Sequence, residues 1–157
     1  MTRAGVVLLL CVLAGCRQVD NLPSYGVVPA FELIAQNGQP FHSRTLHGRI
    51  WVADFIFTTC QGPCPRMTSQ MHRIQTAASN AVKLVSFTVD PRHDTPEVLA
   101  AYAKQHAALA DRWYFLTGPQ ATLHKLDRDA FKLGDVDGSL MHSTDRKSTR
   151  LNSSHRH

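Results

Sequence analysis

Two cysteines, Cys60 and Cys64, are the residues whose type and spacing most directly indicate chemistry. They stand in the segment FIFTTCQGPCP, and the loop they would close as a disulfide is too small to serve as a structural staple. A dithiol could shuttle electrons through a disulfide. Two soft thiolates could instead bind copper(I), with an imidazole completing a three-coordinate site. The plain alternative is two small buried residues without chemistry.

The elements around the cysteines must bring both sulfurs to one point. Residues 50–57 form a nearly continuous apolar run, which predicts a strand buried on both faces. Pro65 suits the first position of a helix running to about Ser79. Cys60 then follows a strand and Cys64 begins a helix, whose N-terminus should stabilise a thiolate and lower the pKa of Cys64.

The rest of the body alternates strands and helices. We expect strands at 31–34, 81–89 and 113–116, with a further extended stretch after Gly38-Gln39-Pro40. Thr95-Pro96-Glu97 starts a second helix with a cap, a first-turn proline and an early acid, and Pro119 opens a third. This order predicts an α/β fold with a central, mostly parallel sheet flanked by helices.

The N-terminal segment has the features of a secretory signal peptide. Arg3 precedes an apolar run from Val6 to Leu13, which is far shorter than the roughly 20 residues a spanning helix requires. Leu13-Ala14-Gly15-Cys16 resembles a bacterial lipobox, which implies cleavage after residue 15 and a lipid on Cys16. An ordinary signal peptide with an incidental cysteine is the alternative. The lipobox implies a chain anchored in the cell envelope, in the periplasm or on the outer face of a bacterial membrane.

Composition limits the chain to one globular domain. Its 157 residues are 43% hydrophobic and 18% charged. The net charge of +5 is concentrated at the ends, because Cys16 to Thr144 holds 12 basic and 11 acidic residues. That region has no basic stripe interleaved with aromatic residues, so we set nucleic-acid binding aside. We divide the chain into a signal peptide (1–15), an anchored spacer (16–30), the domain (31–144) and a basic tail (145–157).

Three separated motifs carry a family resemblance. FIFTTCQGPCP resembles the copper-site loop of the SCO/SenC proteins, SFTVDPRHDTPEVLAAYA is similar to their next strand-to-helix segment, and LMHST resembles the segment that presents their copper-binding histidine. The resemblance implies a thioredoxin-like fold with Cys60, Cys64 and His142 as copper ligands and Asp90 as a supporting residue. It also implies a copper chaperone that delivers copper to the binuclear centre of cytochrome c oxidase, through that enzyme's copper-site subunit.

Other polar residues have plainer interpretations. A lone histidine is more often a surface or core residue than a ligand, and this applies to His42, His47, His72, His93, His106 and His124. His93 follows the second buried strand and could approach the site. Met67 and Met71 suit copper(I), yet their helical spacing favours core packing. Asp54, inside an apolar strand, is a candidate buried carboxylate or a residue at a wet sheet edge.

Two enzymatic functions compete with the chaperone. A dithiol oxidoreductase of this fold usually has two residues between its cysteines, whereas here there are three, and it resembles thioredoxins in needing a cis-proline. This chain has no proline after Pro119 and presents Met141 and His142 instead. Some members of the resembled family nevertheless act as thiol-disulfide reductases. In a thiol peroxidase, Cys60 would attack peroxide and Cys64 would resolve the sulfenic acid.

The C-terminus departs from the family pattern. After His142 the family continues into an apolar strand, a turn and a helix, whereas Leu151 is the only aliphatic residue of segment 145–157. That composition does not suit a buried strand. We therefore expect the domain to lack its C-terminal strand and helix, and the tail to be a cloning fragment rather than native sequence.

Overall fold

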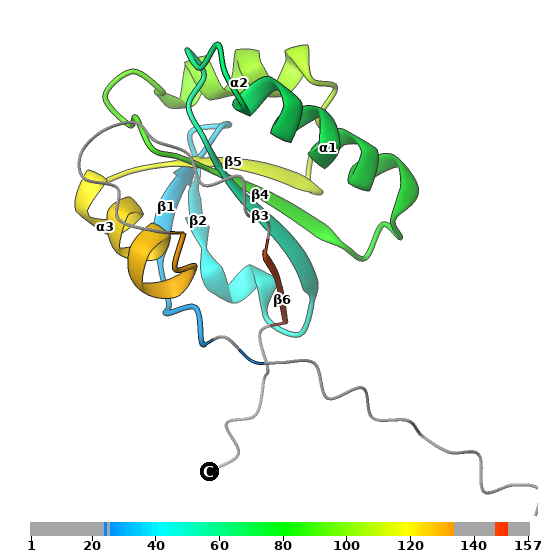
Figure 1. Ribbon diagram of the computed structural model, residues 1–157, viewed down its shortest axis with the longest axis vertical. Coiled ribbons are helices and arrows are strands. Elements are labelled where there is room, and N and C mark those ends of the chain that lie inside the picture. The colour runs from blue at the N-terminus through cyan, green and yellow to red at the C-terminus, as the bar shows by residue number, and fades with distance from the viewer. Residues whose placement is uncertain (1–23, 25, 134–146, 151–157) are drawn as a thin grey trace, which may run out of the picture.

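The computed structural model describes residues 24, 26–133 and 147–150 (Figure 1). Within these residues the chain forms six strands: β1 (Glu32–Ala35), β2 (Pro40–His42), β3 (Ile50–Ile56), β4 (Lys83–Thr88), β5 (Trp113–Thr117) and β6 (Lys147–Arg150). The helices are α1 (Cys64–Ala77), α2 (Pro96–Gln105) and α3 (Gln120–Lys125), with a 3-10 turn η2 (Ser43–Leu46) and a π-helical turn η3 (Leu126–Ala130). The strands and helices expected from the sequence agree with these bounds to within a few residues.

The strands form one sheet in the order β2-β1-β5-β4-β3-β6. β3, β4 and β5 are parallel, whereas β1 pairs antiparallel with both β2 and β5. Parallel strands need crossover connections, which α1 and α2 supply. The predicted α/β fold with a mostly parallel centre is therefore confirmed.

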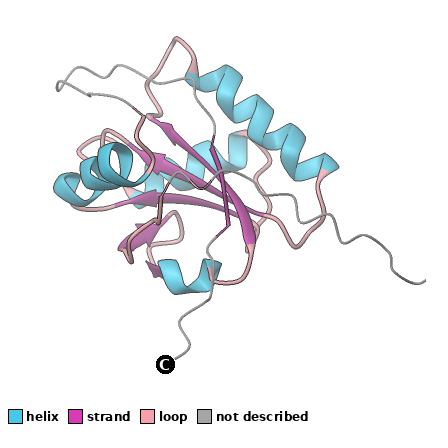
Figure 2. Ribbon diagram, turned by 60° about the horizontal axis from the view of Figure 1, so that its bottom comes forward, coloured by secondary structure: helices cyan, strands magenta, loops and turns pink. Residues whose placement is uncertain are grey.

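Helices cover both faces of the sheet (Figures 1 and 2). On one face, residues of α1 and α2 such as Met71 and Leu99 pack against Ile56 and Trp113 of the sheet. On the other, α3 and η3 cover a second cluster rich in aromatic residues. Successive residues of a strand point to opposite faces, so β3 contributes to both clusters. Because both faces are covered, β3 and β4 are almost entirely buried, as their apolar sequences predicted.

Local sequence sets the start of each helix near the cysteines. Proline occupies the first turn of α1, where a missing N–H leaves no hydrogen bond unmade. The side chain of Thr95 caps α2 by accepting a hydrogen bond from the backbone N–H of Val98, at 3.4 Å. Among the residues that the structure describes, no helix has the length and apolar character that crossing a membrane requires.

One expectation about the C-terminus was wrong. Residues Lys147–Arg150 form the edge strand β6, which pairs antiparallel with Ile50 to Ala53 of β3. The composition argument concerned a buried strand, whereas an edge strand requires only backbone N–H and C=O groups to pair and tolerates polar residues. The sheet therefore has an antiparallel strand beside β3. The expected absence of a final helix concerns residues outside those described.

Candidate functional site

The two loops that carry the candidate residues lie side by side at one edge of the sheet. Residues 57–63 follow β3 and residues 89–95 follow β4, and these strands are parallel neighbours. The backbone N–H of Val89 donates to the carbonyl of Ile56 at 2.8 Å, so pairing continues to the base of the loops. Ligands of open α/β sheets gather at such carboxyl ends of strands.

The structure brings the two predicted cysteines together. Cys64 is the first residue of α1 and is fully buried, whereas Cys60 is partly exposed in the loop before it. Both are thiols, and a side-chain hydrogen bond joins them. A turn closed by the Cys60 N–H and the Phe57 carbonyl, at 3.2 Å, begins the loop. Two soft donors thus meet, one reachable from solvent and one held in the core.

The expected lowering of the Cys64 pKa at the helix N-terminus was wrong. Burial of the thiol, its hydrogen bond with Cys60 and the negative charges of Cys60 and Asp54 raise the pKa of Cys64 to about 12. A hydrogen bond from the Phe57 backbone acts in the opposite direction. Desolvation opposes formation of a buried thiolate more strongly than the terminal peptide dipoles favour it. Without a cation, Cys64 is therefore a protonated thiol at neutral pH.

A buried acid, Asp54, and a partly buried phenol, Tyr102, lie on the cysteine side of the sheet. Asp54 is 2% exposed, which confirms the prediction of a buried carboxylate. The Tyr102 hydroxyl of α2 lies 2.9 Å from Oγ1 of Thr68, and that same Oγ1 donates to the Cys64 carbonyl at 2.9 Å. Burial raises the pKa of Tyr102, whereas its hydrogen bond with Thr68 lowers it, and coulombic interactions with the ionisable groups of Cys64, Asp54 and Cys60 raise it further. Tyr102 therefore links α2 to the start of α1 beneath the cysteine pair.

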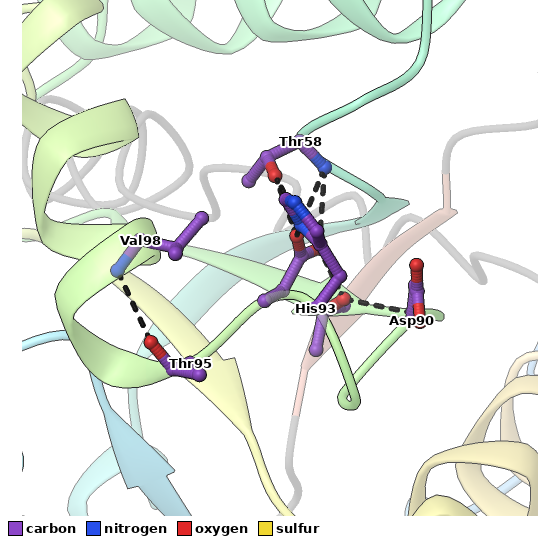
Figure 3. Close-up of polar contacts among 7 residues, drawn as sticks. Thr58, Asp90, His93, Thr95 and Val98 are labelled. Atoms are coloured by element: carbon purple, nitrogen blue, oxygen red, sulfur yellow. Dashed lines mark hydrogen bonds and ion pairs between the residues drawn. The ribbon is translucent and has the colours of Figure 1, made fainter.

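A second buried carboxylate, Asp94, joins the two loops through hydrogen bonds with Thr58 and Thr88. Figure 3 shows Thr58 of the first loop and Asp90 and His93 of the second, with the hydrogen bonds of this network as dashed lines. Its side chain has no solvent exposure. One oxygen accepts from Oγ1 of Thr58 at 2.5 Å, the other accepts from Oγ1 of Thr88 at 2.6 Å, and both accept from the Thr58 backbone N–H, at 3.3 and 3.1 Å. Nδ1 of His93 lies 3.1 Å from the same carboxylate. Thr58 precedes Cys60 by two residues, so Asp94 supports the cysteine loop from the neighbouring loop.

The other residues that the sequence singled out fall into two groups. Some lie at the edge of the site, and others belong to segments that the structure does not describe. Asp90 is partly buried in the loop after β4, and its backbone N–H donates to Oγ1 of Thr88 at 2.9 Å. The His93 ring, half exposed, lies 3.4 Å from Oγ1 of Thr58, so it does approach the cysteine loop. Cys16 and His142 lie outside the described residues. Within the described ranges, no group of three or more His, Cys, Asp or Glu residues is placed to hold a metal ion.

The two methionines that follow Cys64 in α1 are buried in the hydrophobic core. Met67 and Met71 are 5% and 0% exposed, and Met71 belongs to the core cluster beneath α1 and α2. The core-packing interpretation of Met71 is therefore confirmed. Sequence reasoning assigned no role in the site to Thr58, Thr68, Asp94 or Tyr102. Asp94 lies within the motif that follows β4, but sequence position alone does not distinguish a buried acceptor from a surface acid.

Comparisons with known proteins identify relatives of this chain. The sequence pattern of the SCO1/SenC family matches residues 20–146. A Stutzerimonas stutzeri protein, whose name describes it as an expected copper-binding protein, is 35% identical over 111 residues. That alignment covers 68% of this chain and 53% of the relative, so the chain spans about half of the relative's length.

Two solved structures share the fold at substantial identity. A SCO1/SenC family lipoprotein from Bacillus anthracis superposes with a TM-score of 0.71 at 34% identity, covering 80% of this chain and 79% of the other. BsSco, described as a member of the Sco family of cytochrome c oxidase assembly proteins with a disulfide switch, superposes with a TM-score of 0.65 at 32% identity, covering 78% and 73%. These relatives share the overall fold of this chain.

Proposed function

The chain belongs to the SCO1/SenC family, and on that premise we propose that it is a copper metallochaperone that takes its metal at Cys60 and Cys64. The observation that carries the proposal is the meeting of these two thiols at the carboxyl end of β3. Copper(I) prefers such soft sulfur donors. The copper-binding description of the Stutzerimonas relative supports the choice of metal.

The environment of Cys64 suits a cargo site. A cation between the two sulfurs would favour the thiolate forms that burial opposes, so copper loading releases protons. The partly exposed Cys60 gives the metal a point of entry, and the buried Cys64 shields it from water. Asp90, at the edge of the neighbouring loop, supports the site without binding the metal.

We assign the third ligand to His142. The assignment rests on the LMHST segment and on the ability of copper to accept an imidazole as a further donor beside two thiolates. An imidazole is a weaker donor than a thiolate and exchanges more readily. A two-sulfur, one-nitrogen site can therefore hold copper and still release it to a recipient.

The recipient we propose is the copper-site subunit of cytochrome c oxidase. Its support is the family's role in oxidase assembly, which the description of BsSco also states. We further propose that a lipid on Cys16 tethers the domain to a bacterial membrane outside the cytoplasm. The Bacillus anthracis relative, described as a lipoprotein, supports the tether.

Copper binding by the purified, reduced chain tests this function. Cu(I) is titrated in competition with a chromophoric chelator, and we expect one copper per chain. Cys60→Ser and Cys64→Ser each remove a thiolate, so each should weaken binding by at least 100-fold, whereas His142→Ala should weaken it by about tenfold. Circular dichroism of each variant establishes that it is folded.

A matched control separates ligand loss from general effects of substitution. His47 is an exposed histidine at the end of η2, remote in sequence from the motifs of the site. His47→Ala should bind copper as the unaltered chain does. A folded, reduced chain that takes up no Cu(I) at micromolar concentration would rule out the chaperone function.

Thiol-disulfide exchange at the same cysteines is the second candidate. Its support is the hydrogen bond between the two thiols and the disulfide switch described for BsSco. The two functions differ in their dependence on His142. Reduction of a disulfide substrate with multiple turnovers, unaffected by His142→Ala and abolished by Cys60→Ser, would favour the oxidoreductase.

A further inference from the structure

Asp94 is the one fully buried acid in the loop beside the cysteines, and capping of helix α2 does not account for its burial. The N-cap of α2 is Thr95, whose hydroxyl accepts from the Val98 N–H. Apart from the adjacent His93, the hydrogen-bond partners of the Asp94 side chain are Thr58, just after β3, and Thr88, the last residue of β4. The carboxylate thus hydrogen-bonds to the strand ends that carry the site rather than to its own helix.

The contacts of Asp94 hold the base of the cysteine loop. Thr58 lies beyond the last residue of β3, so its backbone N–H can no longer pair within the sheet. Both carboxylate oxygens accept that N–H, and one also accepts the Thr58 hydroxyl. Hydrogen bonds to a charged acceptor are stronger than neutral ones, and burial increases this difference. Thr58 is therefore fixed relative to α2, two residues before Cys60.

The same carboxylate also reaches the loop that carries Asp90. Oγ1 of Thr88 donates to Asp94 and accepts from the Asp90 backbone N–H at 2.9 Å. The Asp90 carbonyl in turn accepts the backbone N–H groups of His93 and Asp94, at 3.2 and 2.9 Å. One buried carboxylate thus contacts the first loop through Thr58 and the second through Thr88.

From this arrangement we propose that Asp94 is a positioning residue of the copper site, acting through Thr58 to hold Cys60 beside Cys64 and through Thr88 to hold the Asp90 loop. The proposal rests on the proposed function for its metal, but the placement of the two sulfurs can be tested without copper. A loop held in the binding geometry loses less conformational entropy when it binds metal. It also raises the effective concentration of one thiol toward the other, which favours the disulfide.

The experiment compares the full chain with Asp94→Asn, which keeps the side-chain shape but replaces one acceptor oxygen with a donor NH₂ group. The dithiol is equilibrated with glutathione disulfide, a reaction that yields the protein disulfide and two glutathione molecules. We expect Asp94→Asn to shift this equilibrium at least threefold toward the dithiol. It should also weaken Cu(I) binding at least tenfold and alter the sulfur-to-copper charge-transfer band after loading with Cu(II). All measurements are made where circular dichroism shows folded protein.

Matched variants isolate the route through Thr58. Thr58→Ser keeps the backbone N–H and the hydroxyl and should behave as the unaltered chain, whereas Thr58→Val loses only the hydroxyl and should give an intermediate shift. Asp127→Asn makes the same exchange at another buried carboxylate, in η3, and should leave the thiol equilibrium and the copper band unchanged.

The possible results keep the inference and the function separate. If the unaltered chain binds no copper, the chaperone function fails while the thiol equilibrium still tests Asp94. If the unaltered chain binds copper and folded Asp94→Asn has the same thiol equilibrium, Cu(I) affinity and charge-transfer band, the positioning role is overturned. Equal shifts in Asp94→Asn and Asp127→Asn would also overturn it, because they would reflect general loosening of the fold.

Discussion

At the scale of single residues, the two cysteines should differ sharply in reactivity. Cys60 is partly exposed, whereas Cys64 is fully buried with its pKa raised to about 12. We expect iodoacetamide at pH 8 to label Cys60 first and Cys64 much more slowly. Below a pKa of 12 the thiolate fraction rises about tenfold per pH unit, so labelling of Cys64 should accelerate steeply between pH 8 and pH 10. Peptide mass spectrometry gives both rates.

Asp54→Asn provides the control for this difference. Asp54 adds a negative charge that contributes to the raised pKa of Cys64, after burial and the interactions with Cys60. Removing the charge should speed labelling of Cys64 severalfold and leave the rate at Cys60 nearly unchanged. Equal labelling of both cysteines in the unaltered, folded chain at pH 8 would contradict the placement of Cys64 in the core.

Sequence reasoning identified the residues of the pair but not their protonation. The spacing and flanking elements predicted that Cys60 and Cys64 meet at a helix start, and the structure confirms that meeting. Whether the helix dipole or burial dominates at Cys64 depends on how completely α2 and the sheet cover it, which involves contacts distant in sequence. Asp94 was missed for the same reason, because its buried position depends on two strand ends that meet only in the fold.

At the scale of elements, α2 matters because the residues that support the cysteine loop lie at its start and on its buried side. Thr95→Ala removes the cap of α2 and should reduce the unfolding free energy by about 1 kcal/mol at pH 7, while Thr95→Ser should preserve it. The Thr95 side chain also lowers the pKa of Glu97, so that favourable interaction is present above the unfolded pKa and is lost as pH falls through the folded one. Urea unfolding should therefore show a smaller cost for Thr95→Ala at pH 3 than at pH 7. A cost that is the same at both pH values would contradict this role.

The sequence predicted the central strands and the helices better than it predicted the edge of the sheet. The apolar runs and the proline and threonine signals placed β3, β4, α1 and α2 to within a few residues. The edge strand β6 was missed because its pairing with β3 uses backbone groups, which every residue carries and which leave no apolar pattern. The pattern of apolar and polar residues indicates which side chains are buried, whereas the pairing of an edge strand does not require its side chains to be buried.

At the scale of the whole molecule, the sheet separates the cysteine face from the face covered by α3 and η3, and Asp127 allows the second face to be probed alone. Burial raises the pKa of the Asp127 carboxyl, so the unfolded chain releases this proton at a lower pH than the folded chain does. The resulting loss of stability is absent in acid, develops as pH rises through the two pKa values and is complete at neutral pH. Asp127→Asn should therefore raise the thermal midpoint more at pH 7 than at pH 3, by about 2–4 °C for each kcal/mol recovered. Because the substitution lies across the sheet from Cys60, Cu(I) affinity should not change. A midpoint that falls at pH 7 would show that the charged carboxylate supports the fold. A midpoint that shifts equally at both pH values would show that the charge of Asp127 does not affect stability.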